Sequence, residues 1–95
     1  MNKDNDYYWQ ELLHIFLSQK NKENMELFLT TLLTISEKTE LIKRYRIIKE
    51  LLENTKTQRE MASDLQVSIA NVTRGSNLLK IGNNSDLKKI FKIKR

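Results

Sequence analysis

The sequence predicts an all-α protein with six helices and no strand. Wherever a periodic pattern occurs, apolar residues recur at intervals of three and four, which is the spacing of one face of a helix. The 95 residues include two glycines and no proline, so residues that break helices are scarce. A content of 39% hydrophobic and 31% charged residues is typical of a folded protein and not of a disordered one.

Two apolar stripes predict the first two helices, on either side of a polar break at residues 19–24. Both helices are apolar over much of their circumference, and one short chain has too few partners to cover them. A helix that is apolar on more than one side must be buried on more than one side. We therefore expect the N-terminal half of the chain to form a dimer. The stripes consist of Trp9, Leu12, Leu13, Phe16 and Leu17, then Met25, Phe28, Leu29, Leu32 and Leu33.

Two capping boxes mark the starts of the next two helices. In each box a threonine hydroxyl accepts from the amide of a glutamate three residues later, and that carboxylate accepts from the amide of the threonine. Thr34 and Glu37 open a long helix, whereas Thr57 and Glu60 open a short one that runs through Asp64. The residues expected to be buried are Leu41, Tyr45, Ile48, Leu51 and Leu52 in the long helix, and Met61 and Leu65 in the short one.

The last two helices are separated by a clear stop signal. Ser68 is a suitable N-cap for a helix over residues 69–80. Gly82, Asn83 and Asn84 should end it, because glycine and asparagine tolerate the left-handed conformation that ends helices. A final helix is expected from Ser85 to about Ile93. The inward residues of these two helices are expected to be Val72, Ser76 and Leu79, then Leu87, Ile90 and Phe91.

The net charge of +5 belongs entirely to the second half of the chain. Residues 1–50 carry eight basic and eight acidic side chains, whereas residues 51–95 carry nine basic and four acidic ones, and 9 − 4 = +5. Such asymmetry is typical of a protein that binds a polyanion, most often nucleic acid. A basic face that serves only solubility remains the alternative on charge alone.

The composition excludes several classes of protein. Without cysteine the chain has neither a disulfide framework nor a thiolate zinc site. No segment approaches the roughly 20 apolar residues of a membrane span, and the polar residues 1–6 are unlike a signal peptide. His14 is the only histidine, and no nucleophile with its base, metal set or phosphate loop is visible. We therefore expect a cytoplasmic protein that is not an enzyme and holds no metal.

Residues 58–76 have the spacing of a helix-turn-helix, in which two short helices are joined by a tight turn. Ala62 is a small residue where the two helices would cross. Gln66 occupies the turn position that commonly holds glycine at a positive backbone angle, which costs a non-glycine residue about 1 kcal/mol. The apolar contacts that would fix the angle between the helices are Leu65, Val67 and Val72.

Residues 68–77 strongly resemble the recognition helix of the tryptophan repressor family, whose hallmark Thr-Arg-Gly-Ser-Asn stands at residues 73–77. Residues 57–60 look like that family's first DNA-contacting helix, and residues 44–52 are similar to its central helix. The likeness extends from about Trp9 to the C-terminus. It implies a six-helix intertwined homodimer with one helix-turn-helix per chain. In a single 1–95 domain, the dimerisation helices would span about 7–56, the helix-turn-helix 57–80 and the C-terminal helix 85–95.

The resemblance also implies L-tryptophan as corepressor. Arg44 and Arg74 should sandwich its indole ring, and the planar guanidinium of Arg74 suits its carboxylate. Gly75 should leave room for the ring beside the backbone. Thr34 can add its hydroxyl to the carboxylate contacts. Backbone carbonyls near Thr31 and Leu33 would receive the ammonium group.

Two positions depart from the family pattern. Leu78 stands where the best-known members have a serine that helps to hold the ammonium group of the ligand. Asn71 stands where they have a threonine near the carboxylate and the DNA. The residue at position 78 bears on the identity of the ligand. The residue at position 71 bears on the contact with the carboxylate and on the operator sequence. The residues expected to contact DNA are Gln58, Arg59, Ser68, Ile69, Ala70, Asn71, Thr73 and Lys80.

The sequence leaves three functions open. The favoured one is a sequence-specific repressor that binds an operator in double-stranded DNA, is activated by L-tryptophan and controls genes of tryptophan biosynthesis or uptake. The second is a repressor of the same fold that is independent of ligand or responds to another indole. A helical module that binds proteins is the third. Salt-dependent DNA binding distinguishes the first two functions from the third. Dependence of that DNA binding on L-tryptophan distinguishes the first function from the second.

Overall fold

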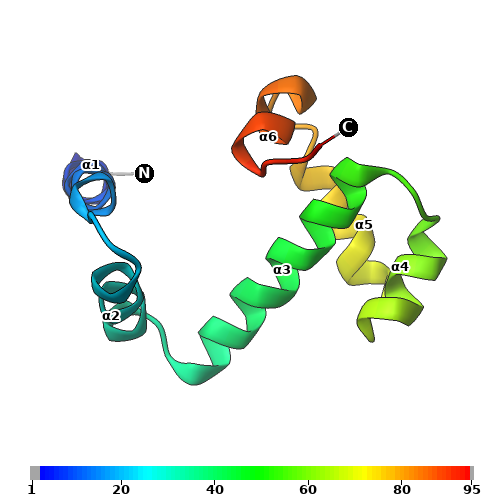
Figure 1. Ribbon diagram of the computed structural model, residues 1–95, viewed down its shortest axis with the longest axis horizontal. Helices are drawn as coiled ribbons and strands as arrows, with labels where there is room; N and C mark the ends of the chain where they lie inside the picture. Colours follow the sequence, from blue (N-terminus) through cyan, green and yellow to red (C-terminus); the bar gives the residue numbers. More distant parts are fainter. Residues whose placement is uncertain (1–2, 95) are drawn as a thin grey trace. The chain divides into compact units, whose positions relative to one another are not determined.

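The computed structural model describes residues 3–94 and contains only helices there, which confirms the predicted all-α fold class (Figure 1). Met1, Asn2 and Arg95, which the predicted 1–95 domain includes, lie outside the described residues. The helices are α1 (Lys3–Ser18), α2 (Lys22–Leu32), α3 (Ile35–Glu53), α4 (Gln58–Leu65), α5 (Ile69–Leu78) and α6 (Asn84–Ile90).

Both predicted capping boxes are present. The amide of Glu37 donates to Thr34 Oγ1 at 3.1 Å, and the amide of Thr34 donates to Glu37 Oε1 at 2.9 Å. Thr57 and Glu60 form the same pair of bonds at the start of α4. Because each carboxylate accepts from a backbone amide and is close to a hydroxyl, the pKa of Glu37 and that of Glu60 are lowered.

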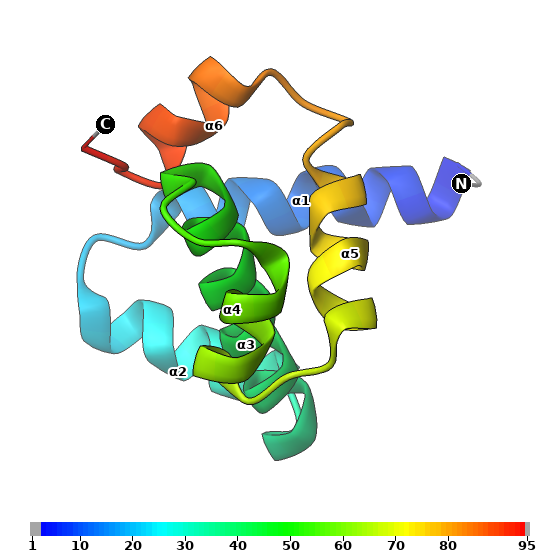
Figure 2. The same ribbon diagram turned by 90° about the vertical axis from the view of Figure 1, so that its right-hand side faces the viewer.

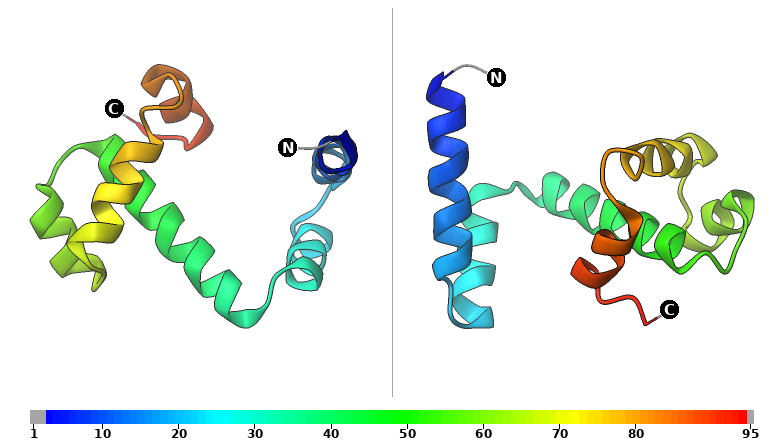
Figure 3. Two further views of the ribbon diagram at one scale, coloured as in Figure 1. Left: turned by 180° about the vertical axis from the view of Figure 1, so that it is seen from behind. Right: turned by 90° about the horizontal axis from the view of Figure 1, so that it is seen from above.

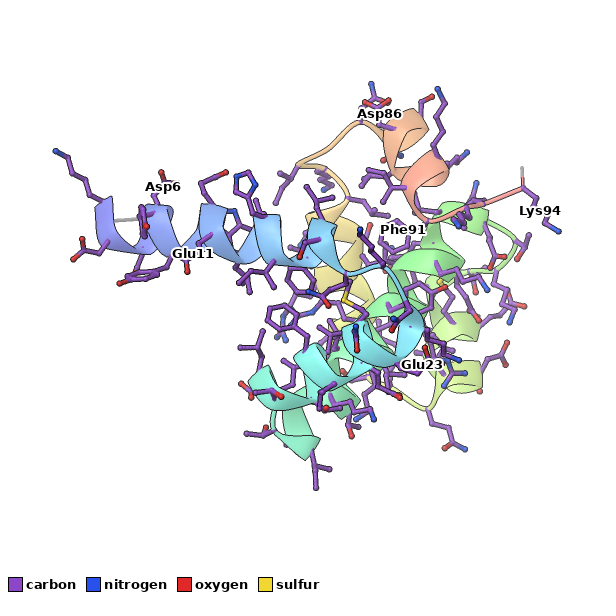
Figure 4. The ribbon with its side chains drawn as sticks, turned by 60° about the vertical axis from the view of Figure 1, so that its left-hand side comes forward. Asp6, Glu11, Glu23, Asp86, Phe91 and Lys94 are labelled. Carbon is purple, nitrogen blue, oxygen red and sulfur yellow. The ribbon has the colours of Figure 1, made fainter. Side chains whose placement is uncertain are left out.

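The chain forms two compact units that meet within α3, one up to Lys38 and the other from Thr39 onward. In the first unit, neither α1 nor α2 contains a buried residue, although the rings of Phe16 and Phe28 meet edge to face at 5.1 Å. Figure 4 shows side chains along both helices. The exposed large apolar residues of α1 and α2 are Tyr7, Tyr8, Trp9, Ile15, Leu17, Leu27 and Leu32.

The second unit holds the hydrophobic core. Val72 of α5 is 0% exposed and packs with Met61 and Ala62 of α4. The C-terminal half of α3 completes this core, because its buried residues lie between positions 47 and 52. Figure 2 shows α4 and α5 side by side. The buried residues are Ile47, Ile48, Leu52, Met61, Ala62, Leu65, Val72 and Gly75.

Three of the inward residues expected in the last four helices are exposed. Leu41 and Tyr45 are 46% and 47% exposed, because core residues of one chain cover only the C-terminal half of α3. Tyr45 nevertheless stacks on Phe91, which Figure 4 labels, with ring centroids 6.0 Å apart. Ile90 is 71% exposed, whereas Leu87 of α6 and Phe91, the C-cap of that helix, are half-buried.

The stop between α5 and α6 differs from the predicted one. Helix α5 ends at Leu78, two residues early, and tight turns follow in which the amides of Lys80 and Ile81 each donate to the carbonyl three residues before. Gly82 does not have a positive φ, so the expected left-handed stop is wrong. Asn83 instead caps α6 and starts it at residue 84, and Lys92 with φ 57° follows its end. Figure 3 (left) shows the path of the chain from α5 into α6.

A fragment of residues 57–95 should not fold cooperatively as a monomer. It lacks α3, whose Ile47, Ile48 and Leu52 supply part of the core. The remaining apolar surface cannot offset the backbone entropy of about 40 residues at about 1–2 kcal/mol each. Circular dichroism during thermal unfolding, with the full chain as control, tests this expectation. A sharp transition in a monomeric fragment would contradict it.

Candidate DNA-binding and ligand site

Helices α4 and α5 are joined by the turn that the sequence predicts. Gln66 lies in the left-handed region with φ 56° and ψ 46°. The amide of Val67 donates back to the carbonyl of Ala62 at 3.0 Å, and Ser68 Oγ caps α5 by accepting from the amide of Asn71 at 3.1 Å. Ala62 and Val72 are both buried between the helices. The expected role of Ala62 as a small crossing residue and the unusual conformation of Gln66 are therefore confirmed.

The eight residues expected to contact DNA all lie in the second unit. Seven are exposed and Asn71 is half-buried. Thr73 Oγ1 donates to Gln58 Oε1 at 3.3 Å, so one polar contact links the start of α4 to the middle of α5. Ile69 is 49% exposed at the first position of α5, and Lys80 lies just beyond the end of that helix.

A lysine that sequence reasoning missed joins α3 to α4. Lys56 Nζ lies 2.8 Å from Asp64 Oδ2 and 3.7 Å from Glu50 Oε1. The hydrogen bond with Asp64, and then the charges of both acids, raise the pKa of Lys56. The other oxygen of Glu50, Oε2, is buried without a hydrogen-bond partner. The positive charge of Lys56 therefore partly offsets the energetic cost of removing the Glu50 carboxylate from water.

A small pocket of about 50 Å³ brings together five of the residues expected to bind the ligand. Within it, Arg74 Nη1 donates to Asn71 Oδ1 at 3.4 Å. Three cations and one acid line the pocket, and Glu40 Oε1 lies 3.5 Å from Lys43 Nζ, so the formal charge is 3 − 1 = +2. This balance favours an anionic ligand. The lining residues are Glu40, Lys43, Arg44, Ile47, Asn71, Arg74, Gly75 and Leu78.

Gly75 is required by helix packing, a reason that sequence reasoning missed. A Cβ on Gly75 would lie 2.7 Å from Ile47 Cγ2 and 3.4 Å from Leu51 Cδ1. Ile47 is itself only 4% exposed, and its Cγ2 is attached directly to Cβ, so it has little freedom to move away. The glycine thus lets α5 approach α3 closely at the floor of the pocket.

The other three predicted ligand residues, Thr31, Leu33 and Thr34, belong to the first unit. Thr31 Oγ1 donates to the carbonyl of Leu27 at 2.8 Å. Leu33 is the half-buried C-cap of α2. The hydroxyl of Thr34 accepts from Glu37 in the capping box, which leaves its proton available to an acceptor. Their part in the ligand site remains a prediction.

A second, larger cavity of about 700 Å³ lies among α3, α4, α5 and α6, and no sequence pattern predicts it. Leu51, Leu52, Met61 and Leu79 form its apolar lining, and Lys80, a predicted DNA contact, also borders it. Among residues 3–94, no three His, Cys, Asp or Glu side chains are grouped to hold a metal ion. No helix in the described part of the chain has the length and apolar character to cross a bilayer.

Two short helices packed around Ala62 and Val72, with an exposed polar face, define an all-α protein of the type common among transcriptional regulators. A model of the Trp repressor protein family matches residues 7–93. The chain belongs to this family, which is a family of transcriptional repressors.

Three relatives show how far the similarity extends, and each is described as a Trp operon repressor homolog. The protein of Vibrio campbellii is 37% identical over 82 residues, which cover 86% of this chain and 82% of the relative. That of Chlamydia trachomatis serovar D is 38% identical over 80 residues, or 84% and 85% of the two chains. That of Xylella fastidiosa is 42% identical over 78 residues, which cover 82% of this chain and 85% of the relative.

Proposed function

We propose that this chain is a sequence-specific DNA-binding repressor that acts as a homodimer in the cytoplasm, is activated by L-tryptophan and controls genes of tryptophan biosynthesis or uptake. One observation carries the proposal. Helix α5 holds Arg74 and Gly75 in a pocket with Arg44, and the same helix exposes Ile69, Ala70 and Thr73, which are the proposed recognition residues. A ligand in that pocket therefore contacts the element that reads the operator.

The pocket has the chemistry that an indole carboxylate needs. Guanidinium groups stack on aromatic faces and bind carboxylates through two parallel hydrogen bonds. Arg44 comes from α3 and Arg74 from α5, and we propose that the indole ring lies between their guanidinium groups. Thr34 is also a proposed partner of the ligand carboxylate, and the backbone carbonyls near Thr31 and Leu33 are proposed acceptors for the ammonium group; these assignments rest on the resemblance to the family.

The second copy of this chain is the proposed partner of the first unit. Helices α1 and α2 contain no buried residue and leave Trp9 47% and Leu17 85% exposed. Apolar surface of this extent is typical of an interface. Leu41 and Tyr45 are exposed apolar residues of the second unit.

The α4–α5 pair is the proposed helix-turn-helix. The start of α4 and the first half of α5 would enter or border the major groove with the exposed residues Gln58, Arg59, Ile69, Ala70 and Thr73. The +5 charge of residues 51–95 attracts the phosphates. Ser68 and Lys80 lie before and after α5, where phosphate contacts orient the helix.

Binding to operator DNA should be strongly dependent on salt and on L-tryptophan. Each phosphate that the dimer neutralises contributes about −0.9 to the slope of log affinity against log salt, so we expect a slope steeper than about −3. Fluorescence anisotropy across a salt series, with and without L-tryptophan, measures both effects. Salt-insensitive binding would contradict a nucleic-acid function. Strong operator binding that is the same with and without L-tryptophan would favour a ligand-independent repressor of this fold.

A second candidate ligand is an indole acid without an amino group. The pocket carries a formal charge of +2 and is lined by the apolar side chain of Leu78, which offers no acceptor to an ammonium group. The same titration with such an acid in place of L-tryptophan separates the two candidates.

A further inference from the structure

We propose that Lys88 of α6 binds a backbone phosphate of DNA beside the one that Lys80 binds, so that α6 is a third element of the DNA interface. The inference rests on the proposed function and extends the same interface beyond α4 and α5. Both lysines line the larger cavity of about 700 Å³, together with Gln58. Because Gln58 and Lys80 are proposed DNA contacts, a DNA backbone that touches both runs along the edge of this cavity.

The charged lining of this cavity is entirely positive, with three lysines and no acid. Lys56 Nζ lies 2.8 Å from Asp64 Oδ2 and 3.7 Å from Glu50 Oε1, so its charge is balanced within the protein. In the part of the chain that the structure describes, Lys80 and Lys88 form no ion pair. The positive charge that is open to an outside anion therefore comes from these two lysines.

The two open lysines lie on the solvent side of the cavity. Its lining includes Leu52 and Met61, which are buried at 3% and 2% exposure, whereas Lys80 is exposed and Lys88 is half-buried. The two lysines also come from different places in the chain, one just after α5 and the other within α6. DNA carries phosphates at regular intervals along each strand, so two separate ammonium groups at one edge can each bind one of them.

Helix α6 is held at both ends, which fixes the position of Lys88. The side chain of Asn83 caps its start. Phe91, the residue after its last turn, stacks on Tyr45 of α3 with ring centroids 6.0 Å apart. The next residue along the helix, Lys89, is exposed and does not line the cavity. The two neighbouring lysines therefore carry the same charge in different surroundings and form a matched pair for an experiment.

Lys88→Gln should weaken DNA binding and reduce its salt dependence. Each contact between an ammonium group and a phosphate contributes about −0.9 to the slope of log affinity against log salt, and a dimer loses two such contacts, so the slope should become shallower by about 1.8. The affinity advantage of the unmodified protein should then shrink about 3.5-fold with each doubling of the salt concentration. Fluorescence anisotropy in the presence of L-tryptophan measures the slope. A duplex of random sequence serves as the probe, because phosphate contacts carry no sequence information.

Lys89→Gln removes the same charge one residue further along α6 and should change the slope by about 0.5 or less, because a charge without a direct phosphate contact is screened by salt. Lys88→Arg keeps the charge and should keep the slope. Equal effects of Lys88→Gln and Lys89→Gln, an unchanged slope in Lys88→Gln, or a shallower slope in Lys88→Arg would overturn the inference and leave DNA binding by α4 and α5 intact. Salt-insensitive binding by the unmodified protein would contradict the proposed function itself, and the inference would fail with it.

Discussion

Replacing Gly75 by alanine should destabilise the protein by about 1–3 kcal/mol, even though alanine is the better helix former by about 1 kcal/mol. The new Cβ would lie 2.7 Å from Ile47 Cγ2, which is buried and attached directly to the β carbon of Ile47. Helix α5 must therefore move away from α3, or Ile47 must leave its place in the core. Chemical unfolding at one fixed protein concentration measures the change.

Two further variants make the result specific to this contact. Gly82→Ala places a Cβ 3.2 Å from Cδ1 of Leu87, the far end of a flexible side chain, so its effect should stay within about 0.5 kcal/mol. Ile47→Ala alone should cost about 2–5 kcal/mol. In the Gly75→Ala background it should cost about 1–3 kcal/mol less, because it removes the clash. Additive effects of the two substitutions, or a stabilised Gly75→Ala variant, would contradict the packing role of this glycine.

Local chemistry made the helix starts and the turn predictable. The capping boxes at Thr34 and Thr57 each depend on residues three positions apart, and the structure confirms both. The same holds for Gln66, whose left-handed conformation follows from the length of the turn between two helices. Signals that act within one turn of chain can be read before the fold is known.

The ends of the last two helices and the role of Gly75 were harder to predict. Glycine and asparagine at 82–84 favour a stop, but they do not say which of them caps the next helix, and Asn83 does so. Gly75 meets Ile47, 28 positions earlier in the chain, and no local pattern indicates that approach. Lys56 likewise meets acids on two different helices.

The ligand site was predictable only in part. Arg44, Asn71, Arg74, Gly75 and Leu78 do line one pocket. Their assignment came from resemblance to a family and not from spacing, because Arg44 and Arg74 stand 30 positions apart. The remaining predicted contacts belong to the other compact unit. In an intertwined dimer, such contacts can come from the second copy of the chain.

Replacing Leu78 by serine should raise the affinity for L-tryptophan by about 10-fold or more. Leu78 lines the pocket at the end of α5 and is 42% exposed, so a ligand beside Arg44 and Arg74 lies within its reach. Leucine offers no acceptor to an ammonium group, and a lost hydrogen bond to a charged group costs about 1.5–3 kcal/mol. That energy corresponds to roughly 10- to 150-fold in affinity.

Indole-3-propionate should respond to the same substitution in the opposite sense. It has the ring and the carboxylate but no amino group, so it gains no partner from serine and loses apolar contact with Leu78. Calorimetric titration of the unmodified protein and of Leu78→Ser with both ligands measures the preference between them. Ile81→Ser, which replaces an 83% exposed side chain outside the pocket, is the matched control and should leave the preference unchanged. If Leu78→Ser also leaves it unchanged, the side chain at position 78 does not sense the ammonium group, and the selectivity of this pocket has another origin.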